Sequence, residues 1–398
     1  MKWCLNREIR NRRITLLMAV PVNGRWGKPG TMKIVHFIYD DIHNPWCGGG
    51  GALRAHEINS RLSSRHQVTA FTGAYPGAKK GFIDGVRYVR LGVGRGYALS
   101  RISYSIIATF LAVFIPHDVL VNDFSVFAPV GGSFMSRGTS VTIIHHVLRR
   151  QNLVKYPVWG IIPLFIEWLF VRFSERIITV SPGTKDILIR MHVRNRNVTV
   201  IPNGIDPSLF KVPYSSGHYV LYLGRFDFFM KGIDTLLDAF STLAGEWKDC
   251  PRLVMAGRAS VEDEKRALKM CSERGILEMV DIRPNVTNGE KKLLLQDAQY
   301  LLLPSRFEGW GIVAIEAAAA GKMTIGSSIS GILNAVRKGE TGFLVEAGDV
   351  RGFSLKMKML AADNELRRKH EPICRDWAAK FSWETAVQQH EEYYQVLL

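Results

Sequence analysis

Short runs of apolar residues alternate along the chain with longer segments in which apolar positions recur at helical spacing. Continuous apolar runs are typical of buried parallel strands, so the alternation predicts parallel sheets covered by helices. The expected strands of the first half are Lys33–Tyr39, Gln67–Phe71, Val86–Leu91, Val119–Asn122, Val141–His145, Arg176–Val180 and Val198–Ile201. Those of the second half are Tyr219–Leu223, Arg252–Ala256, Met279–Ile282, Tyr300–Leu303 and Met323–Gly326. The pattern predicts an α/β fold with two Rossmann-like domains whose parallel sheets face a central cleft.

The two series of strands are separated by residues 202–218, a stretch rich in Pro, Gly and Ser that we interpret as a linker. We therefore expect a basic extension at 1–31, a first domain at 32–205, a second at 206–382 and a final helix at 383–398. The extension loosely resembles a signal peptide, but no cleavage site of small residues follows its apolar run.

Two segments of the first half are unusually apolar. Ile102–Pro116 carries no charge, and its length fits a buried core helix better than a membrane span. Tyr156–Val171 is rich in aromatic residues and is interrupted by Glu167 and two prolines. It fits either a core helix or a helix whose face dips into lipid.

The positive charge of the chain is confined to its first half. The net charge is +16, and residues 32–205 carry 20 basic and 9 acidic residues, whereas residues 206–398 carry 25 and 26. Nucleic acid and an anionic membrane are both targets of such a field. Because no nucleic-acid-binding motif accompanies the charge, we expect a membrane surface and no nucleic acid. Five scattered cysteines predict a reduced, cytoplasmic protein without a zinc site.

The most informative motif holds two glutamates, Glu308 and Glu316, just after the expected strand Tyr300–Leu303. The segment between them runs through a glycine turn into a helix, so both side chains should lie at the carboxyl end of a strand. Open α/β sheets bind ligands there, and the N-terminus of a helix offers free N–H groups to phosphate.

A second loop of the same kind follows the strand Tyr219–Leu223 and carries Arg225 and Lys231 between two glycines. Two cations at the end of a strand can bind a diphosphate and neutralise its charge as it leaves. In the first half, the glycines around Gly50 follow the first strand and can let backbone N–H groups approach a phosphate or sugar. His145 and His146 end another strand, and either could face the ligand.

These loops, together with Val200–Asp206 and Phe381–Glu384, resemble the GT-B nucleotide-sugar glycosyltransferases of family 4, which act with retention of configuration. The resemblance implies that Arg225 and Lys231 bind the donor diphosphate. It implies that Glu308 holds hydroxyls of the donor sugar, that Glu316 binds the ribose, and that the final helix crosses back to the first domain. Also implied are N–H contacts from Gly309, Trp310 and Gly311, a donor contact at Gly50, and a catalytic role for His145 beside Glu308.

The resemblance also implies a reaction without a metal, and no Asp-x-Asp pair suited to a divalent ion is visible. No cofactor is expected beyond the nucleotide-diphosphate sugar, which is the donor substrate. Two departures from the family pattern, Met323 after Gly321-Lys322 and Leu333-Asn334 after Gly331-Ile332, leave the identity of the sugar open.

The function expected from the sequence is a retaining hexosyltransferase of polysaccharide or lipopolysaccharide biosynthesis. Its acceptor would be a lipid-linked or cell-envelope glycan, and it would bind peripherally to the inner face of the cell membrane. The alternatives are other GT-B chemistry, such as a nucleotide-sugar epimerase or a phosphorylase, and a non-catalytic sugar-binding scaffold.

Overall fold

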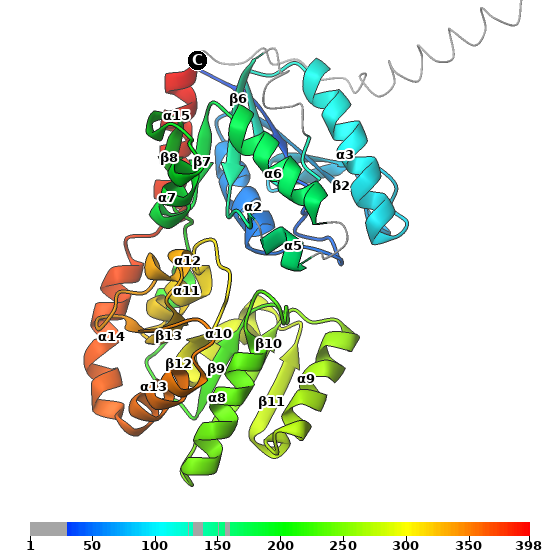
Figure 1. Cartoon of the computed structure of the whole chain (residues 1–398). Coiled ribbons are helices and arrows are strands. Elements are labelled where there is room, and N and C mark those ends of the chain that lie inside the picture. Colours follow the sequence, from blue (N-terminus) through cyan, green and yellow to red (C-terminus); the bar gives the residue numbers. More distant parts are fainter. Residues whose placement is uncertain (1–29, 126, 130–137, 150, 156–159) are drawn as a thin grey trace, which may run out of the picture. The chain divides into compact units, whose positions relative to one another are not determined.

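The computed structural model describes residues 30–125, 127–129, 138–149, 151–155 and 160–398 (Figure 1). Contacts divide the chain into Met1–Met32 and a folded unit, Lys33–Leu398. The basic extension expected at residues 1–31 lies outside the described residues except for its last two positions.

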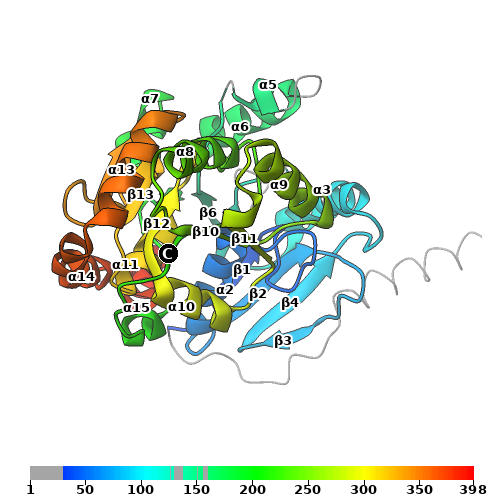
Figure 2. The same ribbon diagram turned by 90° about the horizontal axis from the view of Figure 1, so that it is seen from below.

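The first sheet has eight strands in the order β3-β4-β2-β1-β5-β6-β7-β8. Its strands are β1 Lys33–Phe37, β2 Gln67–Gly73, β3 Gly81–Ile83, β4 Val86–Leu91, β5 Val119–Asp123, β6 Thr139–Ile144, β7 Ile177–Thr179 and β8 Val198–Val200. Among these strands only β3 runs antiparallel, at the edge beside β4 (Figure 2). It was not predicted, because its three residues alternate poorly and form a strand only by pairing with β4.

The second sheet has six parallel strands in the order β11-β10-β9-β12-β13-β14. They are β9 Tyr219–Leu223, β10 Arg252–Gly257, β11 Val280–Pro284, β12 Ala298–Leu303, β13 Thr324–Ser327 and β14 Gly342–Val345. The two parallel-sheet α/β domains confirm the expected fold class. The edge strand β14 was missed, since half of its residues are only partly buried and its apolar run is short.

Helices cover both faces of the first sheet. They are α2 Gly50–Leu62, α3 Tyr97–Phe114, α5 Gln151–Lys155, α6 Ile161–Phe173 and α7 Pro182–Arg190, joined by the last helix of the chain, α15 Trp383–Leu397. Val35 and Phe37 pack in the cluster of α3, whereas His36 between them contacts Asn59 of α2 on the opposite face. The helix α15 packs on α2, which places the end of the chain beside the first sheet (Figure 1).

The second sheet is covered by α8 Ile233–Glu246, α9 Val261–Glu273, α10 Asn288–Asp297, α11 Ile312–Ala319, α12 Ser330–Leu333, α13 Val350–Ala362 and α14 Asn364–Ala378. Local sequence sets several of their starts. Ser260 with Asp263 and Thr287 with Glu290 form capping boxes that satisfy free N–H groups of α9 and α10. Ser382 accepts a hydrogen bond from Thr385 N–H and so begins α15.

The chain passes between the two sheets twice, and the two crossings meet. Ile205 of the first crossing pairs with Ser382 of the second in a parallel bridge. Arg54 of α2 is fully buried beside them and donates to the carbonyl of Ile201 at 3.0 Å and to Asn203 Oδ1 at 2.6 Å. Its guanidinium also lies 2.8 Å from His390 Nε2 of α15. One buried cation therefore joins α2, the linker and the last helix.

The expectation of a buried core helix at Ile102–Pro116 is corrected by the structure. Tyr104, Ala108 and Ala112 of α3 are buried against the sheet, but Ile102, Ile106 and Phe110 are more than half exposed. By length and composition α3 is the one helix in the described residues that could cross a membrane, and 22% of its residues are buried in the protein. Since its small and aromatic face packs on the sheet, α3 is an element of the fold with an apolar outer face.

The second apolar segment also differs from a simple core helix. Residues 156–159 lie outside the described residues, and α6 begins at Ile161. Phe170 and Val171 are buried, whereas Ile161, Phe165 and Trp168 are exposed. Leu120 of β5 packs in the cluster of α3 and pairs with Ser140 of β6. Ile144 lies on the same face of β6 as Ser140 and packs in one cluster with Val171 of α6, so α3 and α6 cover the same face of the first sheet.

Candidate active site

The two candidate loops of the second half meet at one point of the sheet. β9 and β12 are neighbours, and the chain leaves β9 toward β10 on one side and returns to β12 on the other. The crevice at the carboxyl ends of such strands is where open parallel sheets bind ligands. Each loop enters its helix through a left-handed glycine, Gly232 before α8 with φ 63° and Gly311 before α11 with φ 65°. A side chain is disfavoured at both positions.

Lys231 and Glu308, one from each loop, form an ion pair. Their side chains are 15% and 17% exposed, so the pair is partly screened from water yet reachable by a ligand. A cation and an anion from neighbouring strand ends suit a ligand with a phosphate beside a hydroxylated ring. Arg225, from the same loop as Lys231, is exposed, and its carbonyl accepts a hydrogen bond from Tyr222.

Glu316 is buried on α11, and its partner was not predicted from the sequence. Lys291 Nζ of α10 donates to Glu316 Oε1 at 2.7 Å, and the two side chains are 19% and 6% exposed. A buried carboxylate needs such a partner because burial disfavours its charge. In the sequence Lys291 is an ordinary helical lysine, and only the packing of α10 beside α11 brings it to the site.

The turn between the glutamates lies against the first half of the chain. The Ser181 hydroxyl donates to the carbonyl of Gly309 at 3.0 Å. A Cβ added at Gly309 would stand 2.6 Å from the carbonyl oxygen of His145, so only glycine fits there. Trp310 is buried and packs edge-on against Phe381 with ring centroids 5.0 Å apart. Its side chain is therefore part of the core, and only its backbone is available to a donor.

His145 belongs to a buried polar group beneath this contact. Its Nε2 lies 2.9 Å from Asp123 Oδ1, and His36 Nε2 lies 3.6 Å from Asp123 Oδ2. Burial alone would raise the pKa of Asp123. His145 and His36 lower it through their charges and their hydrogen bonds, and the pKa of Asp123 lies well below its usual range as a result. Asp123 is thus a carboxylate that holds the ring of His145 in place.

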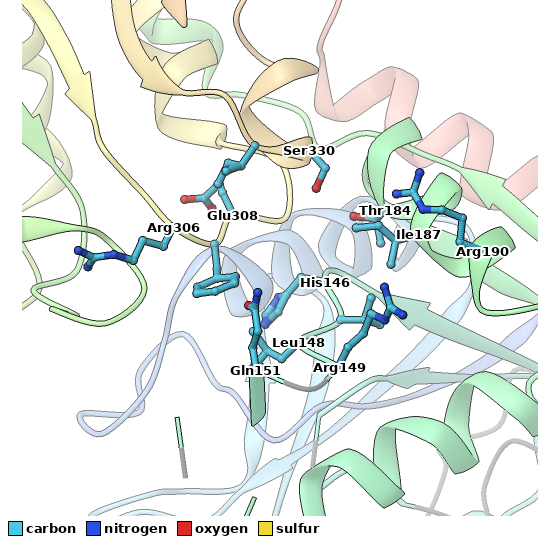
Figure 3. Close-up of a pocket in the computed structure, with 13 residues that line it drawn as sticks. His146, Leu148, Arg149, Gln151, Thr184, Ile187, Arg190, Arg306, Glu308 and Ser330 are labelled. Atoms are coloured by element: carbon cyan, nitrogen blue, oxygen red, sulfur yellow. The ribbon is translucent and has the colours of Figure 1, made fainter. Parts of the chain in front are cut away.

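The neighbouring histidine faces open space instead. A cavity of about 620 Å³ is lined by His146, Arg149 and Thr184 from the first half and by Arg306, Glu308 and Ser330 from the second (Figure 3). His145 does not line this cavity. A Cβ at Gly51 would lie 3.7 Å from His145 Nε2, whereas the space around Gly50 is open, so Gly51 is the glycine closer to this histidine.

No cluster of three or more His, Cys, Asp or Glu side chains suited to a metal ion occurs in the described part of the chain. The positive charges that line the cavity are the arginine side chains Arg149, Arg190 and Arg306. Arg306 donates to Asp234 Oδ2 at 2.6 Å and to Thr235 Oγ1 at 3.2 Å, which holds its guanidinium against the first turn of α8. This arginine was also missed, because in the sequence it is only one residue of the turn before Glu308.

Family models account for both halves of this arrangement. Residues 48–209 match the model of Glycosyltransferase Family 4, and residues 211–376 match that of Glycosyl transferases group 1. The chain belongs to glycosyltransferase family 4. The first match holds His145 and Asp123, and the second holds the ion pairs of Glu308 and Glu316.

Solved structures share the fold over most of the chain. Sucrose-phosphate synthase from Thermosynechococcus elongatus superposes with a TM-score of 0.77 at 19% identity, covering 92% of this chain and 99% of that one. HepE from Anabaena, solved with UDP and glucose, superposes with a TM-score of 0.72 at 18% identity over 92% and 99%. These superpositions establish the GT-B fold for this family 4 member.

Curated relatives match over part of their length. The GDP-mannose:cellobiosyl-diphosphopolyprenol alpha-mannosyltransferase of Xanthomonas oryzae pv. oryzae is 27% identical over 229 residues, which is 56% of this chain and 59% of that protein. The chain spans between 54% and 63% of the length of several curated relatives that it matches.

Proposed function

We propose that this family 4 member is a retaining glycosyltransferase that moves a sugar from a nucleotide-diphosphate sugar to a lipid-linked or cell-envelope glycan. The observation that carries the proposal is the pairing of Lys231 with Glu308 at the meeting point of β9 and β12. A sugar diphosphate offers partners for both charges, since the phosphate takes the cation and the ring hydroxyls take the carboxylate.

On the donor side, Lys231 and Arg225 bind the diphosphate and stabilise the charge that grows on it as the glycosidic bond breaks. The N–H groups at the start of α11, beyond Gly311, add the positive end of a helix dipole. Glu316, held by Lys291, accepts hydrogen bonds from the ribose hydroxyls. Relatives support the donor class, because the HepE structures contain UDP and the Xanthomonas enzyme is named for GDP-mannose.

On the acceptor side, retention is proposed from the resemblance to family 4 glycosyltransferases, which act with retention of configuration. Among the described residues that line the cavity, Glu308 is the only carboxylate, and its charge is engaged by Lys231. The leaving phosphate takes the proton of the acceptor hydroxyl as that hydroxyl attacks the same face of the sugar, and His145 contacts the sugar from the first half.

The proposed acceptor and location rest on surface properties. The exposed apolar faces of α3 and α6 and the positive charge of residues 32–205 suit an anionic membrane on its cytoplasmic side. The Xanthomonas relative is named for a diphosphopolyprenol acceptor, which supports a lipid-linked substrate.

The test is donor-dependent thermal stabilisation across a panel of UDP-, GDP-, ADP- and dTDP-sugars, followed by NMR of the product made from the donor that stabilises most. We expect the sugars of one nucleotide to raise the melting temperature of the protein. We also expect the product to keep the anomeric configuration of the donor sugar. An inverted product would remove the retaining mechanism. Release of an epimerised sugar without acceptor would favour the epimerase alternative. Binding without any turnover would favour the scaffold.

The same assay tests the proposed independence from metal. Turnover should be unchanged by excess EDTA, since Lys231, Arg225 and the start of α11 neutralise the diphosphate. Loss of turnover in EDTA, with recovery on addition of Mg²⁺ or Mn²⁺, would contradict this part of the proposal.

A further inference from the structure

A second cavity adjoins the first and shares two arginines with it. This cavity has a volume of about 580 Å³ and lies between α6 and the end of α7. Arg149 and Arg190 line both cavities, and Figure 3 shows them at the first. A molecule that bound at these arginines could therefore extend into the first cavity toward Glu308 at one end and along α6 at the other.

The loop that carries Arg149 is held in an unusual conformation. Arg149 has φ 54°, a left-handed value that is uncommon for a residue with a side chain. Glu167 of α6 holds it there, accepting the N–H of Leu148 at 2.8 Å and that of Arg149 at 2.7 Å. Strained backbone of this kind persists only where surrounding contacts determine it, and it gathers at binding sites.

Glu167 itself stands out in α6. It is 3% exposed within a helix that is otherwise almost entirely apolar. Burial raises the pKa of its carboxyl, and the two backbone hydrogen bonds oppose that shift. A buried carboxylate is a costly way to stabilise a helix. Its contacts give it a different role, which is to fix the position of Arg149 at the junction of the two cavities.

Among the described residues, the cations at this junction form no salt bridge, although Glu167 lies close enough to Arg149 to feel its charge. Arg149, Arg172 and Arg190 are exposed, and none of them forms a salt bridge with any residue in the described part of the chain. Of the described residues that line the second cavity, Glu167 is the only carboxylate, and its oxygens are occupied by backbone N–H groups. The junction is therefore suited to an anion supplied by a ligand.

The wall of the second cavity is apolar and open to solvent. Ile161, Phe165 and Trp168 line it, and they are 67%, 57% and 51% exposed. The rings of Phe165 and Trp168 stack with centroids 5.8 Å apart, so they form one continuous surface. Exposed apolar area of this extent beside unpaired cations fits a ligand with an anionic head and an apolar tail.

We propose that Arg149 and Arg190 bind the phosphate of an amphipathic acceptor whose apolar tail lies along Phe165 and Trp168 of α6. This inference rests on the proposed function, because it assigns the acceptor of the same transfer reaction. Arginine suits the role, since its planar guanidinium can bind phosphate through two parallel hydrogen bonds. The glycan end of the acceptor then enters the first cavity beside Glu308.

The probe for this site is decyl phosphate, used below its aggregation concentration and titrated into the full-length protein by calorimetry. Inorganic phosphate and decyl glucoside serve as the head alone and as an uncharged tail. We expect one decyl phosphate per chain, bound at least tenfold more tightly than either comparison compound. Equal affinity for decyl phosphate and decyl glucoside would overturn the proposal, because the site would then be an apolar surface only.

Variants assign the two parts of the site. The double variant Arg149→Ala/Arg190→Ala should weaken decyl phosphate binding at least tenfold, whereas Arg351→Ala, an exposed arginine of α13, should leave it unchanged. Phe165→Ser/Trp168→Ser should weaken decyl phosphate binding but leave inorganic phosphate unaffected. Undiminished binding in the arginine variant would refute the site.

Two further measurements distinguish an acceptor site from a bilayer-binding surface and from the donor site. Binding to anionic phosphatidylglycerol vesicles without saturable binding of the monomeric probe would indicate a bilayer surface and would overturn the proposal of an acceptor site. Nucleotide-sugar stabilisation should be the same in the arginine variant and the wild type, because these arginines are assigned to the acceptor. A failed acceptor site with intact donor binding would thus leave the proposed glycosyltransferase function standing.

Discussion

The two halves of the folded unit use charge in opposite ways. Around β9 and β12 three cations are paired with carboxylates, in Lys231–Glu308, Lys291–Glu316 and Arg306–Asp234. Residues 206–398 are accordingly close to neutral, with 25 basic and 26 acidic residues. In the first half basic residues outnumber acidic ones by more than two to one, and Arg149, Arg172 and Arg190 stand without salt bridges in the described part of the chain.

The difference extends to apolar surface. The second sheet packs into one large core in which β9, β12 and their helices are buried. On the first sheet, α3 and α6 bury one face and expose large side chains such as Phe110 and Trp168 on the other. The site in the second half, where the charged side chains are paired and largely buried, suits a small polar donor. Such a donor binds by replacing the ion pairs Lys231–Glu308 and Lys291–Glu316 with its own contacts. An unpaired cationic site beside apolar surface suits a partner that brings both the anion and the apolar tail.

The largest expected effect is at the paired site. Glu308→Gln should lower kcat by a factor of about 100 or more, because the neutral amide loses the charge that pairs with Lys231 and that we propose holds the donor sugar. Glu346→Gln, at an exposed glutamate of the same half, should leave kcat unchanged. Steady-state kinetics with saturating donor decide this, and near-normal turnover in Glu308→Gln would remove the residue from the sugar site.

A stability measurement tests how firmly the halves are joined. Arg54→Ala should lower the free energy of unfolding by roughly 3 kcal/mol, since it leaves Asn203 and the carbonyl of Ile201 buried without their donor. Arg61→Ala is the control on the same helix, because its pairs with Glu57 and Glu384 are partly exposed and should together contribute less than about 1 kcal/mol. Urea unfolding measures both. Equal losses of unfolding free energy in the two variants would show that the burial of Arg54 does not stabilise the crossings between the two sheets.

A smaller effect is expected where the donor contact is only a binding contact. Glu316→Gln and Lys291→Met should each raise KM for the donor about tenfold with little change in kcat, because we propose that Glu316 binds the ribose rather than the reacting carbon. The double variant should be no worse than the worse single one, since each removes the same pair. A fall in kcat with unchanged KM would place this pair at the reaction centre instead.

The smallest expected effect concerns the apolar outer face of α3. Ile106→Ser/Phe110→Ser should reduce co-sedimentation with anionic vesicles several-fold and leave turnover on a soluble acceptor intact. Phe82→Ser, at an isolated exposed side chain on the edge strand β3, is the matched control. Binding should also weaken as salt rises. Equal partitioning of all three proteins onto neutral and anionic vesicles would leave the difference in charge between the halves unexplained.

Much of the fold followed from the sequence, because local pattern determines it. Continuous apolar runs predicted twelve of the strands within a few residues, and the glycines at Gly232 and Gly311 marked the two turns that enter helices. The edge strands β3 and β14 were not predicted, since an edge strand buries few side chains and needs no strong apolar pattern. Of the candidate site, Glu308, Glu316 and Lys231 were visible because each follows a predicted strand at a fixed short distance.

What the sequence by itself determined is the set of loops at the strand ends. Only the tertiary structure decided which side chains meet there. Lys291 reaches Glu316, and Asp123 reaches His145, because separate strands and helices pack side by side, which no local spacing encodes. The same holds for α6, in which Glu167 looked like an interruption of an apolar run. Its role became apparent only when folding placed it under the backbone of Arg149, where a buried carboxylate has N–H groups to accept.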